Sequence, residues 1–151
     1  MNSKLMIPIV ALSLLILMAI YVVVNPSYEK SIRAKYYYEI GEYKEALTLS
    51  KEAFALNVYN RMASTITAQS ITALKYVDYI NDAKKYIKEI DEIATHEFIT
   101  RADKAKIKII CEIMLGTYKK LAPSIITDPK LIDDSAAYHQ KFETLLEKVT
   151  R

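Results

Sequence analysis

Residues 36–47 read YYYEIGEYKEAL and decide the fold, because two amphipathic helical segments meet there at a single glycine. Gly41 can adopt the left-handed conformation that closes a helix without a Cβ clash. The stretch therefore predicts the turn of an antiparallel helix pair. The first helix is expected from about Pro26 to Ile40, and the second from about Tyr43 to Leu56.

The helix starts and the buried faces follow from the flanking residues. Asn25 is a good N-cap, and Pro26 suits the first helical turn. Apolar residues that recur every four positions predict the inward stripe of the first helix. This stripe is Tyr28, Ile32, Tyr36 and Ile40. The expected inward face of the second helix is Tyr43, Ala46, Leu47, Ser50, Ala53 and Phe54.

The composition favours an all-α protein without nucleic-acid binding. Only 2 Gly and 4 Pro occur among 151 residues, against 52% hydrophobic residues, so signals for turns and sheets are scarce. The formal charge of +3 comes from 21 basic and 18 acidic residues, and this balance gives no basic footprint for nucleic acid. Cys111 is the single cysteine, which excludes an internal disulfide.

The N-terminal stretch from Leu5 to Val24 contains twenty residues without a charge. A helix of that length spans about 30 Å, the thickness of the hydrocarbon core of a bilayer. We expect residues 1–25 to form a transmembrane anchor. A cleaved signal peptide is the alternative, but no small-x-small cleavage site follows Val24. The short polar tail before the apolar run predicts that the large domain lies outside the cytoplasm, in the periplasm if the source is bacterial.

The first helix pair resembles a tetratricopeptide repeat. Residues at the family's characteristic spacings are Ala34, Tyr37, Gly41, Tyr43, Ala46, Ala53 and Leu56. The stretch from Ser27 to Asn60 has the 34-residue length of one repeat. The pattern departs from the family at Lys30, Arg33, Ser50 and Val58. The resemblance implies a right-handed stack of about three antiparallel helix pairs behind the transmembrane helix, with a concave groove that binds another protein.

Two further helix pairs are expected. The second pair is predicted at residues 59–76 and 79–94, with Asp78 as the N-cap of its second helix. Residues 26–97 would then hold two tetratricopeptide-like pairs, and residues 98–151 a C-terminal pair that acts as a cap. Its first helix should run from a capping box at Thr100 to about Leu121. Its expected inward face is Ala102, Ala105, Ile109, Ile113 and Gly116. After a loop at residues 122–129, a last helix carries Tyr138, Phe142, Leu145 and Val149 on one face.

The candidate partner-binding residues are Tyr38, Ser64, Gln69 and Thr72. Three consecutive tyrosines span about 200° of a helix, so they cannot all face one core. Tyr38 is the one we expect to be exposed. Tyrosine combines an apolar ring with a hydrogen-bonding tip, which suits a surface that binds protein.

The sequence has little that suggests catalysis. His96 with Glu92, and His139 with Glu143, could each place two metal ligands on one helix face, but no third ligand is near in sequence, so solvated polar pairs are expected. Cys111 lies in an apolar helix stretch and is expected to be an inert core residue. We therefore expect a non-enzymatic protein without cofactor or metal.

The expected function is that of a membrane-anchored helical-repeat adaptor. The expected partner is another membrane-associated protein. The adaptor itself is expected to contact the lipid bilayer through residues Leu5 to Val24. The alternative is a structural accessory subunit of a membrane protein complex, in which the anchor packs laterally through Ser13 and Ala19.

Overall fold

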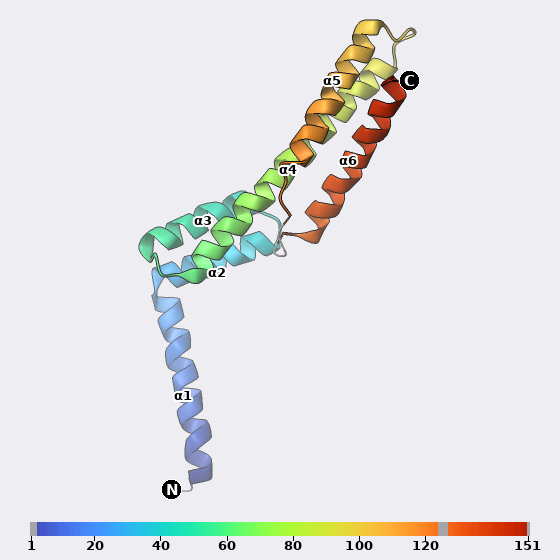
Figure 1. Ribbon diagram of the computed structural model, residues 1–151. Helices are drawn as coiled ribbons and strands as arrows, with labels where there is room; N and C mark the ends of the chain where they lie inside the picture. The colour runs from blue at the N-terminus through green and yellow to red at the C-terminus, as the bar shows by residue number, and fades with distance from the viewer. Residues whose placement is uncertain (1–2, 124–126, 151) are drawn as a thin grey trace. The chain divides into compact units, whose positions relative to one another are not determined.

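The computed structural model describes residues 3–123 and 127–150, and this part of the chain is all-α (Figure 1). Its helices are α1 (Ser3–Val24), α2 (Pro26–Glu39), α3 (Tyr43–Leu56), α4 (Arg61–Ala94), α5 (Arg101–Tyr118) and α6 (Pro129–Thr150). The chain divides into two compact units between Ile71 and Thr72, inside α4. The first unit contains α1, α2, α3 and the start of α4, and the second contains the rest of α4 with α5 and α6.

The predicted start of α2 is confirmed. The Asn25 side chain accepts a hydrogen bond of 3.1 Å from the backbone N–H of Ser27, and Pro26 is the first helical residue. Proline is favourable there because its missing N–H has no partner within the helix in any case. The rings of Tyr21 and Tyr28 lie on either side of this junction, with centroids 6.0 Å apart.

The reversal at Gly41 is also confirmed. Gly41 has a φ of +85°, and its N–H donates to the carbonyl of Tyr38 at 3.1 Å. The N–H of Glu42 donates to the carbonyl of Tyr37 at 2.9 Å. These two nested bonds form a Schellman motif, which satisfies the last carbonyls of α2 and turns the chain into α3.

The predicted inward face of α2 is wrong. The buried side of α2 carries Ser27, Ser31 and Ala34, whereas Ile32, Tyr36 and Ile40 are exposed. Small residues on this side let two helix axes approach closely. The Ser27 hydroxyl donates to the carbonyl of Ala53 on α3, and the Ser31 hydroxyl donates to the carbonyl of Ser27. The face of α3 follows the prediction, with Tyr43, Ala46, Ser50 and Ala53 buried. Phe54, which was expected inside, is exposed.

The predicted break near Asp78 is wrong. Helix α4 runs for 34 residues from Arg61 to Ala94, so the expected second pair is one continuous helix. No glycine or proline interrupts it, and its buried residues keep helical spacing through the expected break, at Ala73, Tyr76, Ile80 and Ala83. Asp78 is exposed within this helix, where no free N–H groups exist for it to cap.

The second unit packs three helical segments around one core. The core comprises Tyr79, Ile80, Ala83, Ile87, Ile90 and Ile93 of α4, Ile107, Ile110, Cys111 and Met114 of α5, and Phe142 of α6. Helices α5 and α6 are antiparallel (Figure 1). The capping box at Thr100 and Asp103 is confirmed, as is Phe142 on the inner face of α6. The Asp128 side chain accepts the N–H of Lys130 at 2.9 Å where α6 begins.

The predicted inward face of α5 is wrong. Ile107 and Ile110 are buried, while Ile109 is 57% exposed and Ile113 is exposed beside it. The α5 sequence carries isoleucines on both sides, so periodicity alone could not select the face. The loop expected at residues 122–129 lies between α5 and α6, and its positions 124–126 lie outside the described residues.

Helix α1 presents its apolar side chains to the surroundings. All its large hydrophobic residues from Met6 to Tyr21 are exposed. Within residues 3–123 and 127–150, no helix taken alone meets the length and hydropathy needed to cross a membrane. Two consecutive helical segments, Met6–Val22 and Pro26–Glu39, meet the length and hydropathy criteria when they are taken together, and their axes are bent by 84°.

Candidate functional site

A cavity of about 400 Å³ opens between α2 and α4 in the first unit. Its lining residues are Lys35, Tyr38 and Glu39 of α2, and Arg61, Met62, Thr65, Ile66 and Gln69 of α4. Each set repeats at intervals of three or four residues, so each occupies one side of its helix. The cavity is therefore formed by two facing helix surfaces.

The floor of the cavity is apolar and belongs to the core of the first unit. Ile66 is buried against Ala34 and Ala46, and Tyr38 packs on the same cluster. The Tyr38 ring also makes an edge contact with Tyr43, with centroids 5.3 Å apart. Because this floor is part of the packed core, the cavity has a fixed base.

The rim of the cavity is charged and exposed. Lys35 and Arg61 supply positive charge, and Glu39 supplies negative charge, while Thr65 and Gln69 add neutral polar groups. An apolar base with a polar rim is the usual composition of a site that binds a protein segment. The titratable lining residues are Lys35, Tyr38, Glu39 and Arg61, and none of the lining residues is a histidine, serine or cysteine.

The structure brings together two of the four candidate partner-binding residues. Tyr38 and Gln69 both line this cavity. Ser64 is exposed on α4 but does not line it, and Thr72 lies beyond the division at Ile71, in the second unit. Tyr38 is half-buried, and the exposed tyrosine of the three is Tyr36, at 62%, which corrects the expectation that Tyr38 would be the exposed one.

Sequence reasoning missed the charged residues of this cavity. Lys35, Glu39 and Arg61 are not among the predicted binding residues, and no residue pattern in the sequence marks a charged rim. The α4 lining residues Met62, Thr65 and Gln69 do recur at helical spacing. That spacing could have indicated a shared surface beside Tyr38 once the packing of α4 against α2 was known.

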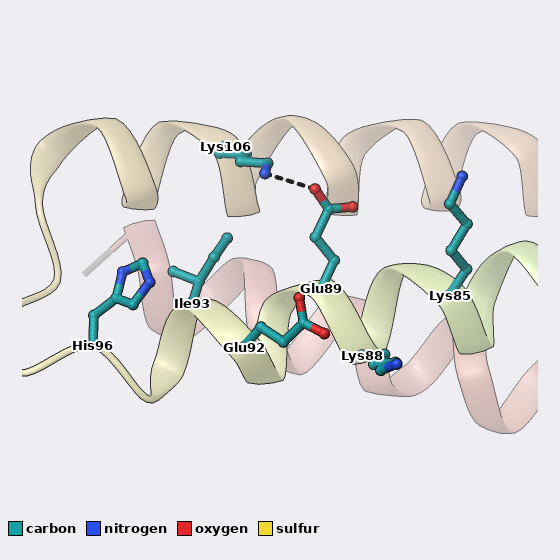
Figure 2. Close-up of a pocket in the computed structure, with 7 residues that line it drawn as sticks. All are labelled: Lys85, Lys88, Glu89, Glu92, Ile93, His96 and Lys106. Atoms are coloured by element: carbon teal, nitrogen blue, oxygen red, sulfur yellow. Dashed lines mark ion pairs between the residues drawn. The ribbon is translucent and has the colours of Figure 1, made fainter.

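A second cavity, of about 450 Å³, lies in the second unit between α4 and α5 (Figure 2). Its lining residues are Lys85, Lys88, Glu89, Glu92, Ile93, His96 and Lys106. Figure 2 shows Lys106 of α5 reaching to Glu89 of α4, and their charged atoms are 2.6 Å apart. The hydrogen bond and charge of Glu89 raise the pKa of Lys106. The lining therefore combines basic and acidic side chains.

Each histidine lies close to one carboxylate. His96 Nδ1 lies 3.7 Å from Oδ2 of Asp103, and His139 Nε2 lies 3.4 Å from Oε1 of Glu143. The Thr100 backbone and hydroxyl donate to the Asp103 carboxylate and lower its pKa. Within the described parts of the chain, no group of three or more His, Cys, Asp or Glu side chains could hold a metal ion.

The core of the second unit contains an aromatic cluster with unsatisfied polar atoms. The rings of Tyr118 and His139 stack with centroids 4.0 Å apart, and Tyr79 lies 5.7 Å from Tyr118. Tyr79 Oη and His139 Nδ1 are buried without a hydrogen-bond partner among the described residues. Burial raises the pKa of Tyr79 to about 12. Burial likewise raises the pKa of the Cys111 thiol to about 11, so the thiol stays protonated at neutral pH.

No protein-family model matches the chain, and no match was found among curated proteins or among solved structures. The class that the fold and the cavity define is thus an all-α protein with a solvent-open cleft between two helices.

Proposed function

We propose that this chain is a membrane-anchored helical-repeat adaptor that binds a segment of another protein, without catalysis, in the cavity between α2 and α4. The observation that carries the proposal is the convergence of Tyr38 and Gln69 on a cavity with an apolar floor and a charged rim. The 34-residue spacing and the Gly41 turn are the features that resemble a tetratricopeptide repeat, a family that implies a protein-binding groove.

The apolar helix α1 supports membrane anchoring. Its large hydrophobic residues are exposed on every side of the helix, so the chain itself provides no core for them. An apolar run of twenty residues from Leu5 to Val24 matches the thickness of a bilayer. We assign this run to the membrane and the helices that follow it to the extracytoplasmic side, with the short polar tail before Leu5 remaining inside.

The chemistry of the cavity defines the segment that fits it. Met62 and Ile66 suit one apolar side chain, which would be the anchor of the partner segment. Lys35 and Arg61 would attract a carboxylate of the partner segment, and Glu39 would attract a lysine or arginine of that segment. We therefore infer a helical or extended segment that carries an apolar residue flanked by charges of both signs. Anchoring raises the local concentration of this site for partners in the same membrane.

A second candidate role is a structural accessory subunit of a membrane protein complex. The observation that favours it is the exposed apolar surface of the second unit. Ile109 and Ile113 are exposed on α5, and Phe98 is 79% exposed in the connection before it. Neighbouring subunits would cover such residues, whereas the adaptor role leaves the cavity between α2 and α4 as the principal contact.

Site-specific photocrosslinking in native membranes distinguishes the two roles. A benzoylphenylalanine at Gln69 places the probe in the cavity, and the same probe at Thr48 places it on the exposed face of α3. The adaptor role predicts a discrete adduct from position 69 and none from position 48. Met62→Asp should weaken the adduct because it replaces an apolar lining residue of the cavity by a charged one, while Ile109→Asp should leave it unchanged.

The opposite pattern overturns the adaptor proposal. An adduct from position 69 that survives Met62→Asp but is lost with Ile109→Asp would assign partner contact to α5 and favour the accessory subunit. Absence of any adduct at position 69, with protein that fractionates with membranes and retains its helical circular dichroism, would reject the cavity as a binding site.

A further inference from the structure

Helix α2 carries an apolar stripe that the fold does not use. The stripe consists of Ile32 and Tyr36 of α2 and of Ile40, the C-cap residue that follows the helix; the three recur every four residues and are exposed. The opposite side of α2, with Ser27, Ser31 and Ala34, is the side buried against the rest of the first unit. The stripe therefore faces away from the protein core, along about 12 Å of helix.

The charges beside this stripe are largely paired. Arg33 Nη1 lies 3.4 Å from Oε1 of Glu29, one helical turn earlier. Lys30 Nζ lies 2.6 Å from Oε2 of Glu52 on α3. Both ion pairs are internal to the first unit, so these four charged side chains have partners within the protein.

The relation between α1 and α2 indicates what covers the stripe. The described parts of the two helices are bent by 84° at the junction that contains Asn25 and Pro26 (Figure 1). If α1 lies close to the bilayer normal, a helix at this angle runs nearly parallel to the bilayer plane. Tyr21 and Tyr28 lie at the junction, which is the level of the interface where tyrosines are enriched in membrane proteins.

We propose that α2 is an interfacial helix whose stripe of Ile32, Tyr36 and Ile40 rests in the headgroup boundary of the same bilayer that holds α1. This inference rests on the membrane anchoring proposed above and names the lipid surface as the second contact. Interfacial helices bury an apolar face about 5–10 Å into the boundary between headgroups and acyl chains. The opposite face of α2 remains packed in the protein.

The contact has a consequence for the cavity. Lys35 and Glu39 of α2 line it and lie on the same helix, within one turn of Tyr36. A lipid-bound α2 would therefore hold the mouth of the cavity at headgroup level. The segment that binds there would be one that leaves a membrane or lies on its surface.

The test uses the full chain in vesicles of phosphatidylcholine and phosphatidylglycerol, with an environment-sensitive fluorophore on a single introduced cysteine. Tyr36→Cys places the label in the stripe, and Thr48→Cys places it on the exposed face of α3 as the matched control. Cys111 remains in place because it is buried. We expect a blue-shifted emission at position 36, protection from aqueous iodide and quenching by spin-labelled lipid headgroups, and none of these at position 48.

Flotation of the same vesicles separates the failure of this inference from the failure of anchoring. Protein that floats with the vesicles while position 36 stays as open to iodide as position 48 would overturn the interfacial contact and leave the anchor standing. Protein that does not float would overturn both. Protection at position 36 in native membranes but not in pure lipid would assign the stripe to a partner protein. In the supporting case, Ile32→Asn with Ile40→Asn should restore access of iodide to position 36.

Discussion

The side-chain amide of Asn60 donates a 2.8 Å hydrogen bond to Oγ of Ser31, although the two residues are 29 positions apart and both are fully buried. Asn60 Nδ2 also lies 2.9 Å from Oγ of Ser27, whose hydroxyl donates to the carbonyl of Ala53. Oδ1 of Asn60 accepts the N–H of Ala63 at 3.2 Å and caps α4. One side chain therefore joins the start of α2, the end of α3 and the start of α4.

Asn60→Ala should destabilise the first unit by about 2–4 kcal/mol. The change removes an N-cap that contributes about 1 kcal/mol and leaves buried serine hydroxyls without their donor. Asn57→Ala is the control, because Asn57 is half-buried and accepts the N–H of Tyr59 at 3.0 Å, so its loss should cost about 1 kcal/mol or less. Denaturant unfolding of the detergent-solubilised chain, followed by circular dichroism, measures both. Equal losses in the two variants would contradict a central role for Asn60.

The two glycines should respond to alanine with opposite signs. Gly41→Ala places a side chain at φ +85°, which costs about 1–2 kcal/mol even though no atom lies within 4 Å of the new Cβ. Gly116 lies inside α5 with equally open space, so Gly116→Ala should stabilise by up to about 1 kcal/mol through helix propensity. Melting temperatures measured in parallel give the comparison. A neutral Gly41→Ala would mean that the left-handed turn does not limit the stability of the helix pair.

Helix ends were the most predictable part of this fold. Asn25 with Pro26, Gly41 and the Thr100 capping box act through backbone groups a few residues away, so a single sequence contains the whole interaction. The all-α class followed from the scarcity of glycine and proline. These signals do not depend on how helices pack against one another.

The faces of the helices could not be predicted with the same success. Bulky Ile32 and Tyr36 were expected inside α2, but Ser31 and Ala34 occupy that position because the close approach of α3 excludes large side chains. The contribution of Asn60 was invisible because its partners lie in distant segments. For the cavity, Tyr38 and Gln69 were among the predicted binding residues, whereas Lys35 and Arg61 required the register of α2 against α4.

Because α4 is continuous through Asp78, Asp78 should not act as a helix cap, whereas Thr100 at the start of α5 should. Asp78→Ala should be neutral or stabilise slightly, by about 0.5 kcal/mol, because alanine is the better helix former at an exposed position inside a helix. Thr100→Ala should cost about 1–2 kcal/mol, because Thr100 Oγ1 accepts the N–H of Asp103 at 3.1 Å in the capping box of α5. Thermal unfolding of the two variants provides the measurement. A substantial loss of stability in Asp78→Ala would indicate that α4 is interrupted at this position.

Tyr79→Phe should stabilise the second unit by about 1 kcal/mol at neutral pH, because it removes a buried hydroxyl that has no hydrogen-bond partner in the described chain. It should also reduce the loss of stability at high pH. Between about pH 10 and 12 the unfolded tyrosine has lost its proton while folded Tyr79, with a pKa of about 12, retains it. The native state then binds more protons, so stability falls as pH rises.

Denaturant midpoints measured from pH 8 upwards would follow this loss of stability at high pH. Cys111, whose pKa is about 11 in the fold, and Tyr76, whose pKa is also raised, should leave a residual slope in the Tyr79→Phe variant. Tyr59→Phe is the control, because the Tyr59 ring is 88% exposed and its removal should change neither the midpoint nor the slope. If Tyr79→Phe lowered stability at neutral pH, its hydroxyl would have to be hydrogen-bonded in solution.

Adjacent isoleucines of α5 test which side of that helix faces the core. Ile110 is buried, and Ile110→Ala should destabilise by about 2–4 kcal/mol through lost burial and the cavity that remains. Ile109 is 57% exposed, and Ile109→Ala should change stability by no more than about 1 kcal/mol. The two variants remove the same atoms, so helix propensity cancels in the comparison. Urea unfolding of the isolated chain in detergent should show this difference. Comparable losses at both positions would mean that Ile109 is covered in solution by a neighbouring molecule, and dilution should then restore the difference.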